Sequence, residues 1–292
     1  MSQTLCILGC GNLGTAILQS LLKSDPQLFT HYIACIKTPS SETRLKSQFP
    51  DTKNLTISTD DNINAIQKAG VVILALDPGL ISTPQGLKQP GLAAALAGKV
   101  LISVVAGWTV QSLEEILYTE PPAESQKVHI VRTLPTIAAQ VSQSLTAIEV
   151  DPSRPPASEH IHLTQKIFNK VGKTLVIPPS LIDATTAVAG STPAMFAIIV
   201  DAMVDAAVAV GVPRQMATGM VVQAMKGSAE ILDSGVTPAE LRDQGTSPEG
   251  CTMGGVMVLE ERGVRGGVGR AVREAVTVAR QMGEGKHLND TR

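Results

Sequence analysis

Residues 4–23 read TLCILGCGNLGTAILQSLLK, and this stretch decides the fold. Its first five residues form an apolar run typical of a buried strand, and its last nine have the apolar spacing of a helix. The turn between them has the pattern G-x-G-x-x-G. Its first glycine permits a tight turn, its second lets a pyrophosphate approach the backbone, and its third lets helix and strand pack closely. Dinucleotide binding is therefore expected here, with a purely structural glycine turn as the alternative. The expected cofactor contacts are Gly9, Gly11, Asn12, Leu13 and Gly14.

Strand-like and helical segments alternate beyond this turn. Strands are expected over residues 32–37, 71–76, 100–105, 129–132 and 174–177, and a helix over residues 159–171. This alternation predicts a doubly wound parallel sheet of the Rossmann type. After the prolines at 178 and 179 the strand pattern stops, and helices are expected over residues 182–190, 193–210, 213–233, 238–243 and 248–262. We therefore predict a dinucleotide-binding domain over residues 1–178 and an all-α substrate and dimerisation domain over residues 179–292.

The helix expected over residues 193–210 is apolar nearly all round, apart from Asp201 and Asp205. A helix of that kind must be covered on every side, so we expect it to be buried core, with the interface of a homodimer or larger homo-oligomer supplying cover. The two aspartates interrupt the apolar run, so we expect no segment to reach the ~20 residues of a membrane span.

Composition points to a small-molecule partner. Lys and Arg number 24 against 26 Asp and Glu, and aromatic residues make up only 2%, which argues against nucleic acid and against an anionic membrane surface. The four cysteines are dispersed and form no metal-ligand pair, so we expect no metal site and a reducing compartment. The first residues show no targeting segment, and a cytoplasmic location is expected.

The end of the second strand indicates which dinucleotide is bound. An acidic residue there would favour NAD, whereas this chain has Lys37 and Thr38, followed by Ser40, Ser41 and Arg44. Positive charge and hydroxyl donors suit a ribose 2′-phosphate, so NADP(H) is expected. The alternative is that Lys37 and Arg44 are ordinary solvated charges. Two later strand ends would border the same crevice and add Ala75, Leu76, Asp77, Pro78, Ala106 and Gly107.

Residues 247–252, SPEGCT, place Ser247 where a helix N-cap belongs and Pro248 at the first helical position. The glycines at 250, 254 and 255 weaken a helix, which is understandable if a ligand approaches closely. An exposed helix N-terminus of this kind binds carboxylates. The alternative is a well-capped helix whose glycines lie at a helix crossing.

These segments, in this order, resemble the pyrroline-5-carboxylate reductase family over residues 5 to about 282. The family's GxGNM turn is similar to residues 9–13, its V-K-P-Q exit to residues 76–79, and its S-x-x-A-G segment to residues 103–107. Its R-x-M-P-N-T-P stretch is similar to residues 132–138, its G-S-G-P-A-Y signature to residues 190–195, and its S-P-G-G-T-T signature to residues 247–252.

The resemblance implies an NADPH-dependent reduction of a cyclic imine, with hydride transfer to the C=N carbon. It implies that Thr252 is catalytic, beside the imine nitrogen, and that Thr136 contacts the cofactor. The implied substrate-binding residues are Ser191, Met195, Ser247, Gly250, Cys251 and Thr252. No His, Asp or Glu base is required, because the iminium form already carries the charge that hydride transfer neutralises.

The chain departs from the family pattern at the site. Asp77 replaces Lys, Thr136 replaces Asn, Met195 replaces Tyr and Glu249 replaces Gly. The substrate is therefore either 1-pyrroline-5-carboxylate or a related substituted pyrroline or piperideine. A catalytically silent NADP-binding regulatory or assembly protein of the same fold is the alternative from another class. A β-hydroxyacid dehydrogenase would need a catalytic lysine early in the second domain, and residues 174–225 contain none.

Overall fold

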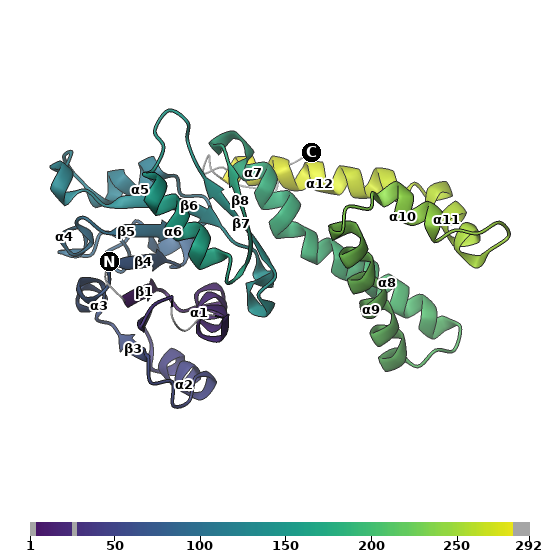
Figure 1. Ribbon diagram of the computed structural model, residues 1–292, viewed down its shortest axis with the longest axis horizontal. Coiled ribbons are helices and arrows are strands. Elements are labelled where there is room, and N and C mark those ends of the chain that lie inside the picture. The colour runs from purple at the N-terminus through teal and green to yellow at the C-terminus, as the bar shows by residue number, and fades with distance from the viewer. Residues whose placement is uncertain (1–3, 25–27, 283–292) are drawn as a thin grey trace. The chain divides into compact units, whose positions relative to one another are not determined.

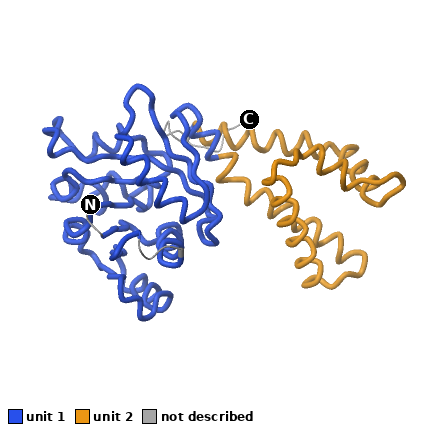
Figure 2. The backbone as a smooth tube through the Cα atoms, viewed as in Figure 1, with its two compact units in different colours: residues 1–186, 281–286 blue, residues 187–280, 287–292 orange. Residues whose placement is uncertain are grey.

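The computed structural model describes residues 4–24 and 28–282 (Figure 1). The chain divides into two compact units, with the division after residue 186 (Figure 2). The first unit holds all strands among the described residues, and the second is helical. The expected combination of a Rossmann-type sheet followed by an all-α region is thereby confirmed.

The first unit is built on one eight-stranded sheet with the order β3-β2-β1-β4-β5-β6-β7-β8. The strands are β1 (Thr4–Leu8), β2 (His31–Ile36), β3 (Leu55–Thr59), β4 (Val71–Leu74), β5 (Val100–Ser103), β6 (His129–Leu134), β7 (Ser144–Glu149) and β8 (Gly172–Ile177). Neighbouring strands are parallel except β6 and β7, which pair in antiparallel fashion. The strand order reverses between β1 and β4, and ligands bind at this type of switch point.

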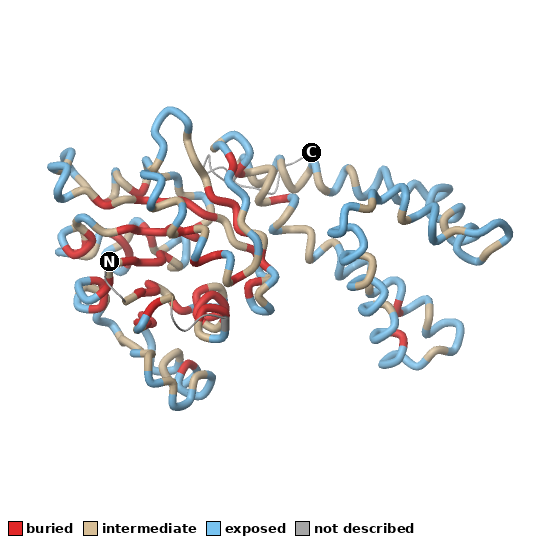
Figure 3. The backbone as a smooth tube through the Cα atoms, viewed as in Figure 1, coloured by how far each residue is buried: buried red, intermediate tan, exposed pale blue. Residues whose placement is uncertain are grey.

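Helices cover both faces of the sheet. They are α1 (Asn12–Ser24), α2 (Pro39–Gln48), α3 (Asn62–Lys68), α4 (Leu92–Leu96), α5 (Val110–Leu117), α6 (Ser158–Phe168) and α7 (Ile182–Thr185), with short 3₁₀ turns η1 (Pro78–Leu80), η2 (Glu124–Gln126), η3 (Ile137–Val141) and η4 (Pro179–Leu181). Successive side chains of a strand point to opposite faces, so Ile7 belongs to the buried cluster that includes residues of α1 and α6, while Leu8 belongs to the cluster that includes residues of α3 and α5. The buried side chains form two large clusters and a small third one at Ala147, Ile177 and Ile182, and most buried residues lie in the first unit (Figure 3).

The second unit consists of helices. After the π-helical turn η5 (Thr186–Ser191) come α8 (Thr192–Ala209), α9 (Arg214–Asp233), α10 (Pro238–Gln244), α11 (Cys251–Glu261) and α12 (Val264–Met282). Helices α8 and α9 pack against each other. Helix α12 was not expected from the sequence, because glycines at 266, 267 and 269 interrupt its pattern.

One expectation about α8 is wrong, namely that no segment would be long and apolar enough to span a membrane. The helix is mostly exposed within one chain: Ile198 is 73% exposed, and Val204 is its only described buried residue, so any cover has to come from outside the chain, as the expected homo-oligomer interface would supply. Residues Pro179–Ala209 also form a helical stretch of 31 residues that is long and apolar enough to span a membrane, with 11% of its most apolar window buried. The stretch is this long because Pro193 does not end it. Pro193 has no N–H to donate to the preceding turn. The π-helical hydrogen-bond pattern of η5 accommodates this loss, so the helix continues.

Candidate functional site

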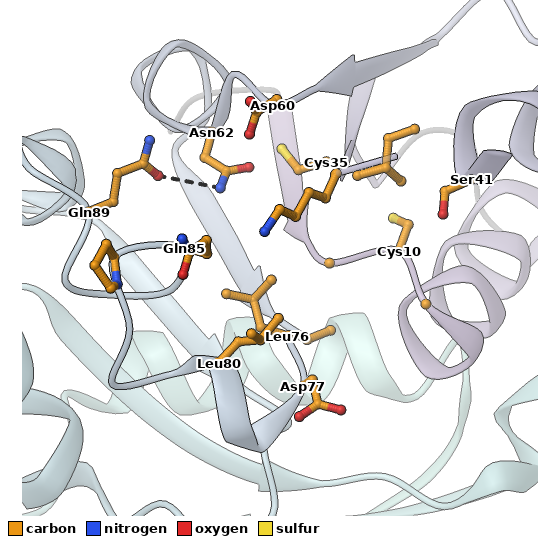
Figure 4. Close-up of a pocket in the computed structure, with 16 residues that line it drawn as sticks. Cys10, Cys35, Ser41, Asp60, Asn62, Leu76, Asp77, Leu80, Gln85 and Gln89 are labelled. Atoms are coloured by element: carbon orange, nitrogen blue, oxygen red, sulfur yellow. Dashed lines mark hydrogen bonds between the residues drawn. The ribbon is translucent and has the colours of Figure 1, made fainter. Parts of the chain in front are cut away.

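A pocket of about 270 Å³ lies in the first unit, where β1, β2, β3 and β4 end (Figure 4). Four strand exits contribute to its wall, because the carboxyl ends of parallel strands share one edge of the sheet. Of the residues expected at the cofactor, six line it together: Gly9, Gly11, Lys37, Ala75, Leu76 and Asp77.

The three glycines of the turn after β1 have different environments. Gly9 has φ +94°, and an added Cβ would lie 2.6 Å from the carbonyl oxygen of Ala75. A Cβ on Gly14 would lie 2.2 Å from the carbonyl oxygen of Gly9. Gly11 has an ordinary φ, and an added Cβ would meet no protein atom within 4 Å. Gly9 and Gly14 are thus required by the fold, whereas Gly11 leaves free space beside the pocket.

The exit of β2 carries hydroxyl groups and one cation. Lys37 is exposed and lines the pocket together with Ser41. Thr38 caps α2: its hydroxyl oxygen accepts a hydrogen bond from the Ser41 N–H at 3.3 Å and lies 3.0 Å from the hydroxyl oxygens of both Ser40 and Ser41. A lysine beside a helix N-terminus with three hydroxyls provides the donors that a phosphate needs, and no acidic residue stands at this strand end.

Arg44 does not belong to this group. Its guanidinium turns back to the glycine turn, where Nη2 donates to the carbonyl oxygen of Cys10 at 2.6 Å and Nη1 donates to Thr15 Oγ1 at 3.2 Å. Arg44 was expected to be either a phosphate contact or a solvated charge, and the structure places it in a third role, as a contact between α2 and the turn after β1.

The exits of β4 and β5 are joined by the single tryptophan. Trp108 Nε1 donates to the carbonyl oxygen of Pro78 at 3.0 Å. Asp77 accepts from the Gly79 N–H at 2.8 Å and so begins η1. Gly107 has φ +78°, which turns the chain after β5. Expected cofactor contacts that lie on these and neighbouring elements without lining the pocket are Asn12, Leu13, Gly14, Thr38, Pro78, Ala106, Gly107 and Thr136.

Thr136 is held by the protein itself. Its side chain is buried, its N–H donates to Ser144 Oγ at 2.9 Å, and its hydroxyl lies 3.4 Å from the same atom. It begins η3 between β6 and β7. Thr136 therefore stabilises the loop after β6 and does not line the pocket.

Several pocket residues were missed by the sequence reasoning: Cys10, Cys35, Ile36, Asp60, Asn62, Leu80, Pro84, Gln85 and Gln89. The amides of Asn62 and Gln89 face each other across the pocket wall, with Nδ2 donating to Oε1 at 3.4 Å (Figure 4). Cys10, Cys35 and Ile36 lie in the glycine turn and in β2, next to residues that were expected at the cofactor. No local signal marks the others, because they follow the unrecognised strand β3 or lie in the irregular segment after β4.

Two thiols at or near the pocket, Cys6 and Cys10, have raised pKa values. Burial raises the pKa of the Cys10 thiol well above its ordinary value. The pKa of Cys6 is also raised, first by its hydrogen bond to Cys35, whose sulfur lies 3.6 Å away, and then by burial. These cysteines therefore act as apolar core and not as nucleophiles.

None of the described histidines lines the pocket. His31 and His129 begin β2 and β6, at the amino edge of the sheet, opposite the pocket. His129 stacks with His160 of α6 at a centroid distance of 4.5 Å.

The expected carboxylate-binding segment of the second unit begins differently from the prediction. Residues 247–250 form a turn in which the Gly250 N–H donates to the Ser247 carbonyl at 3.0 Å, and α11 starts at Cys251 with Gly250 as its N-cap. Ser247 is therefore not the cap, and Pro248 lies in the turn rather than in the helix. Glu249 has φ +60°, a conformation that favours glycine. A Cβ on Gly250 would lie 2.5 Å from Ser247 Oγ, which can rotate away, and 3.0 Å from the Ser247 carbonyl oxygen, so glycine fits this turn most easily.

The start of α11 presents two backbone N–H groups that have no partner among the described residues. The first intrahelical bond runs from the Met253 N–H to the Gly250 carbonyl at 3.1 Å, so the N–H groups of Cys251 and Thr252 precede the helical ladder. Thr252 is exposed at this end. The other expected substrate residues lie on α8: Ser191 is its N-cap and Met195 is half-buried in its first turn.

Known proteins resemble both parts of the chain. The family described as pyrroline-5-carboxylate reductase dimerisation matches residues 179–282, and the family described as NADP oxidoreductase coenzyme F420-dependent matches residues 4–107. A pyrroline-5-carboxylate reductase of Lophium arboricola is 39% identical over 312 residues, which cover 99% of this chain and 96% of that protein.

Solved structures show the same fold. A pyrroline-5-carboxylate reductase of Coxiella burnetii superposes with a TM-score of 0.80 at 23% identity, covering 96% of this chain and 98% of that one. A pyrroline carboxylate reductase of Plasmodium falciparum, solved with NADP bound, superposes with a TM-score of 0.76 at 23% identity and with the same coverage.

Proposed function

The chain belongs to the pyrroline-5-carboxylate reductase family, and on that premise we propose that it reduces the C=N bond of a cyclic imine carboxylate with NADPH. The substrate is 1-pyrroline-5-carboxylate, which would yield proline, or a related substituted pyrroline or piperideine. One observation carries the proposal: the full-length relatives match the dinucleotide pocket and the helical unit together. We assign the cofactor to residues 1–178 and the substrate and dimer contacts to residues 179–292.

The pocket residues fit NADP(H). The open space at Gly11 admits a pyrophosphate, since neither packing nor backbone conformation demands glycine there. Lys37 and the hydroxyls of Thr38 and Ser41 suit the 2′-phosphate. The amides of Asn62 and Gln89 offer both donors and acceptors to the polar edge of an adenine. When bound, the cofactor supplies the hydride.

The residues of the second unit suit the substrate. The N–H groups of Cys251 and Thr252 at the start of α11 bind the carboxylate, with Gly250 allowing close approach. The Thr252 hydroxyl holds the imine nitrogen and its proton, which keeps the electrophilic iminium in place. A separate general base is not needed for this step, and the described histidines lie outside both segments.

The second unit is proposed to work as a homodimer or larger homo-oligomer. Large apolar side chains of α8, α9 and α11, such as Ile198, Met220 and Met257, are 73%, 58% and 65% exposed in one chain. They lie within the residues that match the dimerisation family, so a second copy of this chain is the natural cover. We also propose a cytoplasmic location, which the dispersed free cysteines support.

Turnover tests the function. NADPH oxidation is measured with 1-pyrroline-5-carboxylate, 1-pyrroline-2-carboxylate, a piperideine carboxylate and a carboxylate-free pyrroline. Rapid reduction of the first makes the chain a proline-forming reductase. Activity confined to another imine carboxylate would indicate that the departures from the family pattern, above all Thr136 and Met195, mark a changed specificity. NADPH binding without turnover of any imine would contradict the proposal and indicate a catalytically silent protein.

A further inference from the structure

Arg44 closes a small hydrogen-bond network around the glycine turn. The carbonyl oxygen of Cys10 accepts from Arg44 Nη2 at 2.6 Å and from Thr15 Oγ1 at 3.0 Å, and Thr15 Oγ1 accepts from Arg44 Nη1 at 3.2 Å. The three groups come from α2, from the turn after β1 and from α1. We call this set the Arg44 clamp.

The clamp determines the orientation of one peptide group. The carbonyl of Cys10 and the N–H of Gly11 belong to the same peptide, and no peptide bond among the described residues is cis. In a trans peptide these two groups point in opposite directions. With the carbonyl held by Arg44 and Thr15, the Gly11 N–H must point away from α1 and α2.

That direction is where a ligand anion would lie. Gly11 lines the pocket, no protein atom occupies the space beside its Cα, and its N–H has no hydrogen-bond partner among the described residues. The preceding N–H groups are used within the protein, since those of Gly9 and Cys10 both donate to the Cys35 carbonyl, at 3.2 and 3.0 Å. Gly11 is therefore the first residue of the turn with a donor available for a pyrophosphate.

We propose that Arg44 is a positioning residue for the cofactor: it holds the Cys10 carbonyl so that the Gly11 N–H is directed at the pyrophosphate, and it does not read the 2′-phosphate. This inference rests on the proposed dinucleotide site. The inference assigns different roles to the two basic residues near the end of β2. Lys37 distinguishes NADPH from NADH, whereas Arg44 acts on the part that the two cofactors share.

The test is calorimetric titration of the purified full-length protein with NADPH and with NADH, without imine. Arg44→Met should raise both dissociation constants by the same factor, about tenfold, which corresponds to the loss of hydrogen bonds from a charged donor. Lys37→Met should raise the NADPH constant alone. Lys46→Met is the matched control: it removes a cation from the same helix, one that is 66% exposed and paired with Glu42, and both constants should stay unchanged.

Two further variants separate positioning from folding. Arg44→Lys, which keeps the charge and one donor, should recover part of the affinity for both cofactors. Thr15→Val removes one corner of the clamp and should weaken both by about threefold, consistent with one lost neutral hydrogen bond.

Either of two results would overturn the inference. If Arg44→Met raises the dissociation constant for NADPH by a factor ten times larger than that for NADH, Arg44 is a 2′-phosphate contact. Unchanged constants in both Arg44→Met and Thr15→Val would show that the clamp does not orient the Gly11 N–H. Because cofactor binding is measured without substrate, these results are independent of whether any imine is reduced.

Discussion

Arg132 on β6 and Glu149 on β7 form an ion pair across the two antiparallel strands of the sheet, with Nη1 2.7 Å from Oε2. Their side chains are only 10% and 9% exposed. The pair lies next to the register partners Thr133 and Ile148, so it joins the strands where the sheet changes direction. Charges buried this deeply are stable only together, because each alone would lose its hydration without compensation.

Breaking this pair should therefore destabilise the protein. Arg132→Met or Glu149→Leu alone should lower the free energy of unfolding by about 3 kcal/mol, because the remaining charged partner stays buried. The double variant Arg132→Met/Glu149→Leu should lower the free energy of unfolding by clearly less than the two single variants added together. Chemical denaturation of all four proteins measures the coupling energy, and additive losses would show that the pair contributes no specific interaction.

Gly11→Ala should weaken NADPH binding without affecting the fold. The new methyl group meets no protein atom but occupies the space left for the pyrophosphate, so we expect at least a tenfold rise in the NADPH dissociation constant. Quenching of Trp108 fluorescence, from the sole tryptophan, is a convenient readout beside the pocket. Gly9→Ala is the contrasting variant: its positive φ and the clash with Ala75 should lower the melting temperature as well.

Lys37→Glu should reverse the cofactor preference. A carboxylate at the end of β2 repels a 2′-phosphate and accepts a hydrogen bond from a free ribose hydroxyl. We expect NADPH affinity to fall by one to two orders of magnitude while NADH affinity is unchanged or improved. Equal losses for both cofactors would remove Lys37 from the phosphate site.

Thr252→Ala should lower turnover and leave NADPH binding intact. Loss of a hydroxyl that holds the imine and its proton should reduce kcat by about 10²-fold, the usual contribution of such a group. Thr252→Ser should restore most of the rate because it keeps the hydroxyl. Steady-state kinetics with saturating imine and cofactor measure this, and an unchanged rate in Thr252→Ala would exclude Thr252 from the mechanism.

Glu249→Gly should stabilise the turn before α11. Glu249 has φ +60°, where a side chain costs about 1 kcal/mol relative to glycine. After the entropy that glycine loses on folding, a net gain of about 0.5 kcal/mol is expected in thermal unfolding. Glu249→Ala removes the charge but keeps the Cβ, so it should give no gain. A similar gain in both variants would assign the effect to charge instead of backbone conformation.

Much of the first unit could be predicted because its signals are local. The apolar run of β1 and the three glycines after it lie within a few residues of one another, so strand, turn and helix follow from neighbouring side chains. Strands β3 and β7 could not be predicted in this way. Leu55–Thr59 alternates apolar and polar residues over only five positions, and it becomes a strand because β2 pairs with it.

The sequence by itself determined the doubly wound sheet, the glycine turn and the all-α second part, because periodicity, glycine and proline act over short distances along the chain. Only the tertiary structure decided which donors are free. Arg44 and Lys37 are both basic residues near the end of β2. In the structure, Arg44 donates to the carbonyl oxygen of Cys10, 34 residues away in the sequence, whereas Lys37 lines the pocket. The tertiary structure also placed Thr136 against Ser144 and left the apolar helix α8 uncovered in a single chain. Hydrogen bonds and burial depend on which segments meet in space, and no pattern within one segment contains that information.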